Sequence, residues 1–349
     1  MRFSEIQGQK RAVGLLLSAL RLGRVHHAWL FTGPEGVGKE TTARAFAQSL
    51  LCPSPVEGEG CGECPTCRKV ERNLHPDLLQ ILPEALAVER GLLAREEVGR
   101  TPSRELRIEQ IRNLESALAI APVEGERRVV LLLSADSMNA AAQNAFLKTL
   151  EEPPPGTHIV LVAEAGDRLL PTIRSRCVRV PFGPLPLSFV AERLEEERGI
   201  EAEEARLLAA LAGGSLGRAL RLTPEALQGR AQIIEELERL SSSDFRPLLA
   251  LAERIAAGGR DEAELRLDAI ALFYRDAAIL ASGASTEEVI ANRDLLPLLR
   301  EAAGRGALDA LARYRGTQRA KEALARYAIP RLAVERFLLS CVLGEEEAA

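Results

Sequence analysis

Four of the six cysteines in this 349-residue chain lie close together, between residues 52 and 67. Four thiolates at such spacing can surround one tetrahedral Zn²⁺, and a closed four-sulfur site leaves no open position for water. We therefore predict a structural zinc site, with an iron–sulfur cluster or a redox switch as the alternatives. His75 is the nearest alternative ligand, but it stands in a His-Pro-Asp turn. The predicted metal ligands are Cys52, Cys61, Cys64 and Cys67.

A glycine-rich stretch from Gly33 to Lys39 fits the G-x-x-x-x-G-K pattern of a phosphate-binding loop. It follows a predicted strand at 28–31 and precedes a predicted helix at 40–51, which is the context that this motif requires. In such a loop, backbone N–H groups surround phosphate oxygens, and the lysine adds a full positive charge. The predicted nucleotide-contacting residues are Gly33, Gly36, Gly38, Lys39, Glu40 and Thr41.

Two positions that would bind magnesium in an ATPase carry other residues here. The residue after the loop lysine is normally serine or threonine, but in this chain it is Glu40. Thr41 follows, about 100° further round the helix. At the end of the third strand, Leu133 and Ser134 replace the acidic pair that would hold Mg²⁺ and orient water, and Asp136 lies beyond them. We expect binding of ATP or ADP to be weak or absent and hydrolysis to be lost.

The elements that must position these residues alternate between strands and helices in the first half of the chain. This alternation predicts a parallel sheet covered by helices on both faces. We predict strands at 28–31, 78–82, 128–133, 159–163 and 178–182, and helices at 9–23, 40–51, 108–118 and 140–152. Residues 83–104 are interpreted as a loop or insertion, with room for a helical piece. Beyond about residue 184 only helical patterns remain, at 187–198, 201–212, 216–221, 224–240 and within 244–344.

Composition and charge limit the possible functions. The chain is 46% hydrophobic and 27% charged, which is typical of a globular protein with a core. Its net charge of -5 argues against a nucleic-acid binder that acts by itself. No apolar run approaches the roughly 20 residues that span a bilayer, and the first residues lack the apolar segment of a signal peptide. We therefore expect a cytoplasmic protein, in which clustered cysteines indicate metal rather than disulfides.

An arginine stands directly before the last predicted strand, in Ser175-Arg176-Cys177. An arginine at this place can project from the surface of the domain. By charge alone, Arg176 is interpreted as one member of a solvated run that also contains Arg174 and Arg179.

The motifs occur in an order that resembles the clamp-loader subunits of bacterial DNA polymerase III, over roughly residues 1–220. The family fold is an α/β AAA+ module of the P-loop NTPase type with a parallel sheet, followed by a small helical lid domain and an all-α collar domain. This resemblance implies a RecA-like AAA+ domain at 1–182 with its zinc-binding module at 52–67, a helical lid at 183–242 and a collar for oligomerisation at 243–349. The motifs are Phe3 to Gln9, His27 to Phe31, the phosphate loop, the four cysteines, Asn144 to Pro154 and Ser175-Arg176-Cys177.

Within this family the chain resembles the delta-prime type, because its magnesium-binding elements are eroded. The resemblance implies a largely non-hydrolysing subunit that joins gamma/tau and delta subunits in a hetero-pentamer and helps to load the sliding clamp onto primed DNA. It also implies that Arg176 acts in trans as an arginine finger, at the ATP of a neighbouring subunit. Gly214 to Leu220 resembles the second sensor segment, with Gly217 where an active subunit has arginine and Arg218 displaced by one.

Two other hypotheses stay open at this point. The chain could be an active gamma/tau-type ATPase in which Glu40 or Asp136 serves as the metal ligand. It could also be an unrelated AAA+ adaptor with no role at the replication clamp.

Overall fold

The computed structural model describes residues 2–222, 229–283 and 289–343, which fall into two compact units. The first unit contains the chain up to Pro186 together with Ser215–Arg218, and the second contains Leu187–Gly214 and the chain from Ala219 onward. The division into three domains, with boundaries after residues 182 and 242, stays a prediction. None of the helices in the described ranges combines the length and apolar character that crossing a membrane requires.

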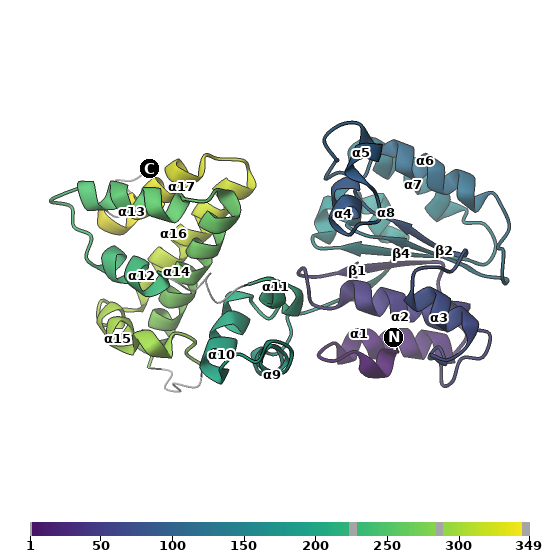
Figure 1. The fold of residues 1–349 in the computed structure, drawn as a ribbon, viewed down its shortest axis with the longest axis horizontal. Coiled ribbons are helices and arrows are strands. Elements are labelled where there is room, and N and C mark those ends of the chain that lie inside the picture. The colour runs from purple at the N-terminus through teal and green to yellow at the C-terminus, as the bar shows by residue number, and fades with distance from the viewer. Residues whose placement is uncertain (1, 223–228, 284–288, 344–349) are drawn as a thin grey trace. The chain divides into compact units, whose positions relative to one another are not determined.

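The first unit is built on a five-stranded parallel sheet (Figure 1). The strand order is β2-β3-β4-β1-β5, and each predicted strand is confirmed to within two residues at either end. The side chains of the interior strands are mostly buried on both faces, which is why their sequences are apolar runs rather than alternating patterns. The strands are β1 Ala28–Thr32, β2 Leu78–Ile81, β3 Arg128–Leu132, β4 Thr157–Ala163 and β5 Val178–Pro181.

Helices cover both faces of this sheet, as predicted (Figure 1). The face that contains Trp29 and Phe31 packs against α1 Lys10–Arg21, α2 Lys39–Leu51 and α3 Pro65–Glu71. The opposite face, which contains Leu30, packs against α6 Ile108–Leu118, α7 Ala140–Glu151 and α8 Pro171–Ser175. The predicted insertion at 83–104 contains two short helices, α4 Glu84–Glu89 and α5 Arg95–Val98.

A buried ion pair joins the start of β2 to β3. The carboxylate of Asp77, which is fully buried, accepts the backbone N–H groups of Val123 and Glu124, both at 2.8 Å, and lies 3.3 Å from the Arg128 guanidinium. Burial by itself would raise the pKa of Asp77, but the N–H donors of Glu124, Val123 and Arg128 hold it below its ordinary value. This carboxylate therefore stays charged inside the unit and fixes the edge of the sheet.

The second unit consists of helices, with no strand among its described residues. Its core forms around α14, where Phe273 and Tyr274 are fully buried and the Tyr274 hydroxyl donates to Glu238 at 2.8 Å. The predicted helical residues 224–228 and 344 lie outside the described residues. The helices that lie wholly in this unit are α9 Leu187–Arg198, α10 Ala202–Leu211, α12 Arg230–Glu238, α13 Arg246–Ala256, α14 Arg260–Ala281, α15 Leu296–Gly304, α16 Ala307–Ala325 and α17 Pro330–Leu343. The short helix α11 Leu216–Arg221 begins in the first unit and ends in the second.

Candidate functional site

The predicted phosphate loop connects β1 to α2, so the strand–loop–helix context of the motif is confirmed. Gly36 and Gly38 have φ angles of 68° and 96°, in the left-handed region where glycine is favoured. A Cβ atom at Gly36 would also lie only 2.4 Å from the Ser215 Oγ atom. The loop therefore needs glycine at both positions for backbone conformation, and at Gly36 for space as well.

The side chain of the loop lysine, Lys39, forms hydrogen bonds within its own loop. The Lys39 ammonium donates to the carbonyl oxygen of Gly33 at 2.6 Å and to that of Pro34 at 2.5 Å. Burial lowers the pKa of Lys39, while the nearby carboxylates of Glu164, Asp136 and Glu35 act in the opposite direction. Its positive charge, which would attract phosphate, is thus partly balanced by acidic side chains of the same chain.

Glu40, at the position of the magnesium-binding hydroxyl, is held by two arginines. Its two carboxylate oxygens accept the two Nη groups of Arg90, each at 2.8 Å, and Oε1 also accepts Arg44 Nη2 at 2.8 Å. Burial would raise the pKa of Glu40, but the hydrogen bonds from Arg90 and Arg44 lower it below its ordinary value. The carboxylate is therefore charged, yet both of its oxygens already have cationic partners. Thr41 lies beside it on the first turn of α2, half-buried.

The residues at the end of β3 provide no replacement for the acidic pair. Leu133 is buried in the core, and Ser134 adopts a left-handed φ of 52° at the turn that follows. The Oδ2 atom of Asp136 accepts the backbone N–H of Ala165 at 3.1 Å. Asp136 therefore anchors the backbone after β4 through this oxygen.

The stretch 214–220, which resembles a second sensor segment, packs directly on the phosphate loop. The backbone N–H of Gly217 donates to the carbonyl oxygen of Gly36 at 3.0 Å. A Cβ atom at Gly217 would lie 2.9 Å from the Gly36 Cα atom, which is closer than real Cβ contacts. With the backbone in this place, an arginine side chain has no room at position 217. The backbone N–H of Arg218 donates to Ser215 Oγ at 3.0 Å, which caps the start of α11.

The four predicted cysteines come together, with all four Sγ atoms within 4.8 Å of one another. Two of the sulfur–sulfur distances are 3.7 Å, for Cys52 to Cys61, and 3.9 Å, for Cys61 to Cys67. A tetrahedral zinc site with Zn–S bonds of about 2.3 Å has sulfur–sulfur edges of about 3.8 Å. The cluster therefore has the right donors at the right separations to bind a metal ion. His75 is not part of it: its Nδ1 atom accepts the backbone N–H of Asp77 at 3.1 Å, and its Nε2 atom lies 3.6 Å from Glu124 Oε2.

Local secondary structure positions these sulfurs. Cys52 follows the last residue of α2, and Cys64 caps the N-terminus of α3, where its Sγ atom accepts the N–H of Cys67 at 3.3 Å. The Cys61 Sγ atom accepts the N–H of Cys64 at 3.4 Å. Backbone N–H donors lower the pKa of Cys61 to about 6, whereas burial raises the pKa of Cys67 to about 12. A bound cation would favour the thiolate form at all four positions.

Arg176 lies at the edge of the sheet opposite to the phosphate loop. It follows α8 and precedes β5, whose first residue, Val178, pairs with Trp29 in parallel β1. The phosphate loop follows the other end of β1, after Thr32. At about 3.3 Å per residue, the two edges are separated by at least about 10 Å. Arg176 therefore cannot contact a phosphate held in its own chain's loop.

In this chain the Arg176 guanidinium is held by a carboxylate. Its Nη2 atom lies 2.5 Å from Glu151 Oε1, and its Nη1 atom donates to the Thr172 carbonyl oxygen at 3.0 Å. The side chain is 35% exposed and lines a hollow of about 400 Å³ that also contains His26, His27 and Cys177. The arrangement is an oriented, accessible cation at the surface of the unit.

Three ion-pair partners of the predicted site residues, Arg44, Arg90 and Glu151, were not predicted from the sequence. Arg44 stands four residues after Glu40, a spacing that places both on one helix face, so this partner could have been found. Arg90 and Glu151 are 50 and 25 residues from their partners, and no local pattern indicates either contact.

The first unit has a parallel sheet of order β2-β3-β4-β1-β5, a glycine loop between β1 and α2, and helices on both faces. A helical C-terminal region follows it. This arrangement is an α/β AAA+ fold of the P-loop type, as predicted. The family model described as "DNA polymerase III, delta subunit" matches residues 8–186, and the chain belongs to this family.

Several known proteins are similar to this chain. The DNA polymerase III subunit delta' of Bacillus subtilis is 30% identical over 84% of this chain and 83% of that protein. The subunit delta' of Pseudomonas aeruginosa is 36% identical, over 61% of each. The subunit tau of Escherichia coli is 29% identical over 81% of this chain, which spans 45% of tau. The crystal structure of a DNA polymerase III gamma subunit-related protein of Thermotoga maritima matches 96% of this chain and 99% of that protein's chain, with 19% identity and a TM-score of 0.41.

Proposed function

We propose that this chain is the delta-prime subunit of a bacterial DNA polymerase III clamp loader. In this role it is a largely non-hydrolysing AAA+ subunit that helps to load the sliding clamp onto primed DNA during replication. Its partners would be gamma/tau and delta subunits in a hetero-pentamer, the sliding clamp, and primer–template DNA through the assembled complex, in the cytoplasm. Its division into AAA+, lid and collar domains belongs to the same proposal.

The main support for this proposal is that the side chains at the magnesium-binding positions are paired within the chain or replaced by apolar residues. Hydrolysis of ATP requires a seat for Mg²⁺ and a carboxylate that orients water. Here the Glu40 carboxylate is paired with Arg90 and Arg44, and the Lys39 ammonium donates to carbonyl oxygens of its own loop. Leu133 stands in the core where an acidic residue would be needed. Weak or absent binding of ATP and ADP is the expected consequence.

The alternative of an active gamma/tau-type ATPase would need Glu40 or Asp136 as a metal ligand. Both oxygens of Glu40 already accept from Arg90, and Asp136 accepts from the Ala165 backbone. A metal ion would have to displace these contacts, and the alternative is therefore disfavoured. Family membership likewise argues against an unrelated adaptor.

Arg176 supplies the chemical contribution under this proposal. Because it stands at the sheet edge away from its own phosphate loop, its guanidinium can serve only a phosphate that belongs to another subunit. A guanidinium at that place would neutralise the negative charge that develops on the transferred phosphoryl group. The Glu151 carboxylate holds the arginine until a more strongly charged phosphate replaces it.

We also assign the four-cysteine cluster to one structural Zn²⁺. The cysteines are the ligands, and zinc would supply no chemistry beyond cross-linking the end of α2 to the start of α3. All four ligand positions come from the protein, which supports a structural role.

Steady-state ATP hydrolysis and nucleotide titration of the isolated chain test the proposal. We expect no measurable turnover, and binding of a fluorescent ATP analogue that is weak with or without magnesium. A Lys39→Ala variant serves as the control for any residual signal. Robust turnover that Lys39→Ala abolishes would establish the active ATPase instead.

A further inference from the structure

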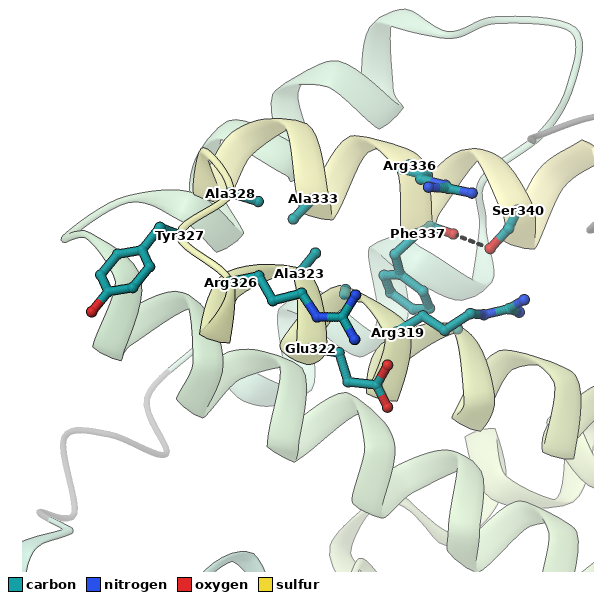
Figure 2. A pocket seen from close by; sticks show the side chains of 12 residues that line it. Arg319, Glu322, Ala323, Arg326, Tyr327, Ala328, Ala333, Arg336, Phe337 and Ser340 are labelled. Atoms are coloured by element: carbon teal, nitrogen blue, oxygen red, sulfur yellow. Dashed lines mark hydrogen bonds between the residues drawn. The ribbon is translucent and has the colours of Figure 1, made fainter. Parts of the chain in front are cut away.

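Two helices of the second unit, α16 and α17, enclose a groove of about 470 Å³ (Figure 2). The helices follow one another in the chain and are connected by a short turn that begins at Arg326. The floor of the groove is made by small and apolar residues of both helices, and its rim by charged ones. The floor residues are Gly316, Ala320, Ala323, Ala333 and Phe337, and the charged residues are Arg319, Glu322, Arg326 and Arg336.

The hollow exists because α16 presents small residues to α17. Gly316, Ala320 and Ala323 are spaced four and three residues apart and so share one helix face. A Cβ atom at Gly316 would lie 3.0 Å from the Phe337 ring, so the ring lies against the glycine with no space to spare. Further along this face, alanines leave the groove open beside the aromatic ring.

The rim carries an excess of positive charge. Three arginines and one glutamate line the groove, which leaves a formal charge of +2, although the whole chain has a net charge of -5. Within the described residues, Arg326 and Arg336 form no ion pair, whereas Arg313 and Arg331 of the same two helices pair with Asp309 and Glu335. Figure 2 shows Arg326 extending along the groove. Two guanidinium groups thus face the hollow without a carboxylate partner among the residues that the structure describes.

Apolar side chains continue from the groove onto the neighbouring surface. Tyr327, Ile329 and Leu332, at the turn and the start of α17, are 78%, 63% and 58% exposed. The Tyr327 ring points away from the groove (Figure 2) and stacks under the Arg260 guanidinium, 4.5 Å from it. Exposed aromatic and aliphatic residues beside arginines are the composition of protein-binding surfaces rather than of solvated ones.

We propose that this groove binds an acidic amphipathic helix of a partner protein. An apolar side chain of that helix packs on Phe337 and the alanines, and its flanking carboxylates pair with Arg326 and Arg336. The groove between two packed helices accepts a third helix in the ridges-into-grooves manner. Guanidinium groups on opposite sides of the groove select carboxylates by two-point hydrogen bonding. The proposal is independent of the nucleotide site and of Arg176.

Fluorescence anisotropy with the full-length chain tests this site. The probe is a fluorescein-labelled helical peptide of about fourteen residues, with leucines on one face and glutamates on its flanks. We expect saturable binding that salt weakens, and a loss on the order of tenfold or more when glutamines replace the glutamates. The Arg326→Ala/Arg336→Ala double variant should weaken binding on the order of tenfold. Arg193→Ala, which removes an exposed arginine from α9 of the same unit, should leave binding unchanged.

Two further variants separate a specific site from general attraction. Ala323→Phe fills the floor and should weaken binding while circular dichroism stays unchanged. The Arg326→Glu/Arg336→Glu double variant should bind a peptide with lysines in place of the glutamates more tightly than it binds the glutamate peptide. Equal binding of the glutamate and glutamine peptides, or no saturation up to about 1 mM peptide, overturns the proposal. Sedimentation that shows self-association broken by the double variant would assign the groove to a second copy of this chain, which also overturns it.

Discussion

The Glu40 carboxylate and the Arg90 guanidinium meet in a two-point ion pair, with both N–O distances at 2.8 Å. Glu40 is the second residue of α2, directly after the loop lysine, and Arg90 is the C-cap residue of α4 in the 83–104 insertion. One contact therefore does two things. It occupies the carboxylate that stands in the magnesium position, and it ties the insertion to the body of the first unit.

Replacing Arg90 by alanine should loosen the insertion more than it destabilises the unit. The pair is partly exposed, at 34% and 28%, so its loss should cost about 1 kcal/mol or less of unfolding free energy. We expect protease to cleave the stretch 91–102 on the order of tenfold faster, because cleavage follows local opening. Limited proteolysis with mass spectrometry measures this, and Arg95→Ala in the same insertion is the control. Equal cleavage rates in both variants would contradict the anchoring role.

The cysteine cluster should contain about one zinc per chain when the protein is purified without chelator. Cys61→Ser should lose the metal and lower the melting temperature by several degrees, because metal binding adds to folding free energy. Acidification should release the metal, since protons compete for the thiolates. Plasma emission spectrometry measures the content, and Cys341→Ser in α17 should keep it. Wild-type protein free of zinc but containing iron would favour the iron–sulfur alternative.

The buried Asp77–Arg128 pair should stabilise the first unit in a pH-dependent way. Asp77→Ala leaves the buried Arg128 charge without its carboxylate partner and should cost about 3–5 kcal/mol of unfolding free energy. The pKa of Asp77 is lowered in the folded chain, so its contribution is present above the ordinary aspartate pKa and disappears as the pH falls through the folded value. Urea unfolding at several pH values measures this.

Asp244→Ala, which breaks an exposed pair with Arg246, is the matched control and should leave the free energy of unfolding nearly unchanged, because solvent screens an exposed pair. If Asp77→Ala costs no more than this control, the buried pair does not stabilise the unit.

Arg176→Ala should lower ATP turnover of a reconstituted clamp loader by about 10³-fold at the affected site. The pair with Glu151 is partly exposed, so the free energy of unfolding should change by about 1 kcal/mol or less. The defect would then be catalytic rather than structural. Steady-state turnover with gamma/tau and delta subunits, clamp and primed DNA is the measurement. Arg179→Ala, in β5 beside it, should keep the normal rate, and an unchanged rate for Arg176→Ala would refute the finger.

Short-range features of the first unit were predictable because neighbouring residues decide them. The apolar runs of β1 and β3 indicated buried parallel strands, and the cysteine spacing indicated a metal cluster that the structure brings together. The loss of the magnesium hydroxyl was visible directly in Glu40. What could not be predicted was how that loss is accommodated, because Arg90 and Glu40 are 50 residues apart and meet only in the folded chain.

The strands and helices, the phosphate-loop and cysteine motifs and the missing acidic pair after β3 follow from the order of residues, since each depends on residues within a few positions of one another. Three relationships became visible only in the folded chain: Gly217 contacts Gly36, Arg176 stands at the opposite sheet edge from its own loop, and arginines from the hairpin of α16 and α17 share one groove. These relationships join segments distant in the chain. They depend on strand order and helix packing, which no local pattern encodes.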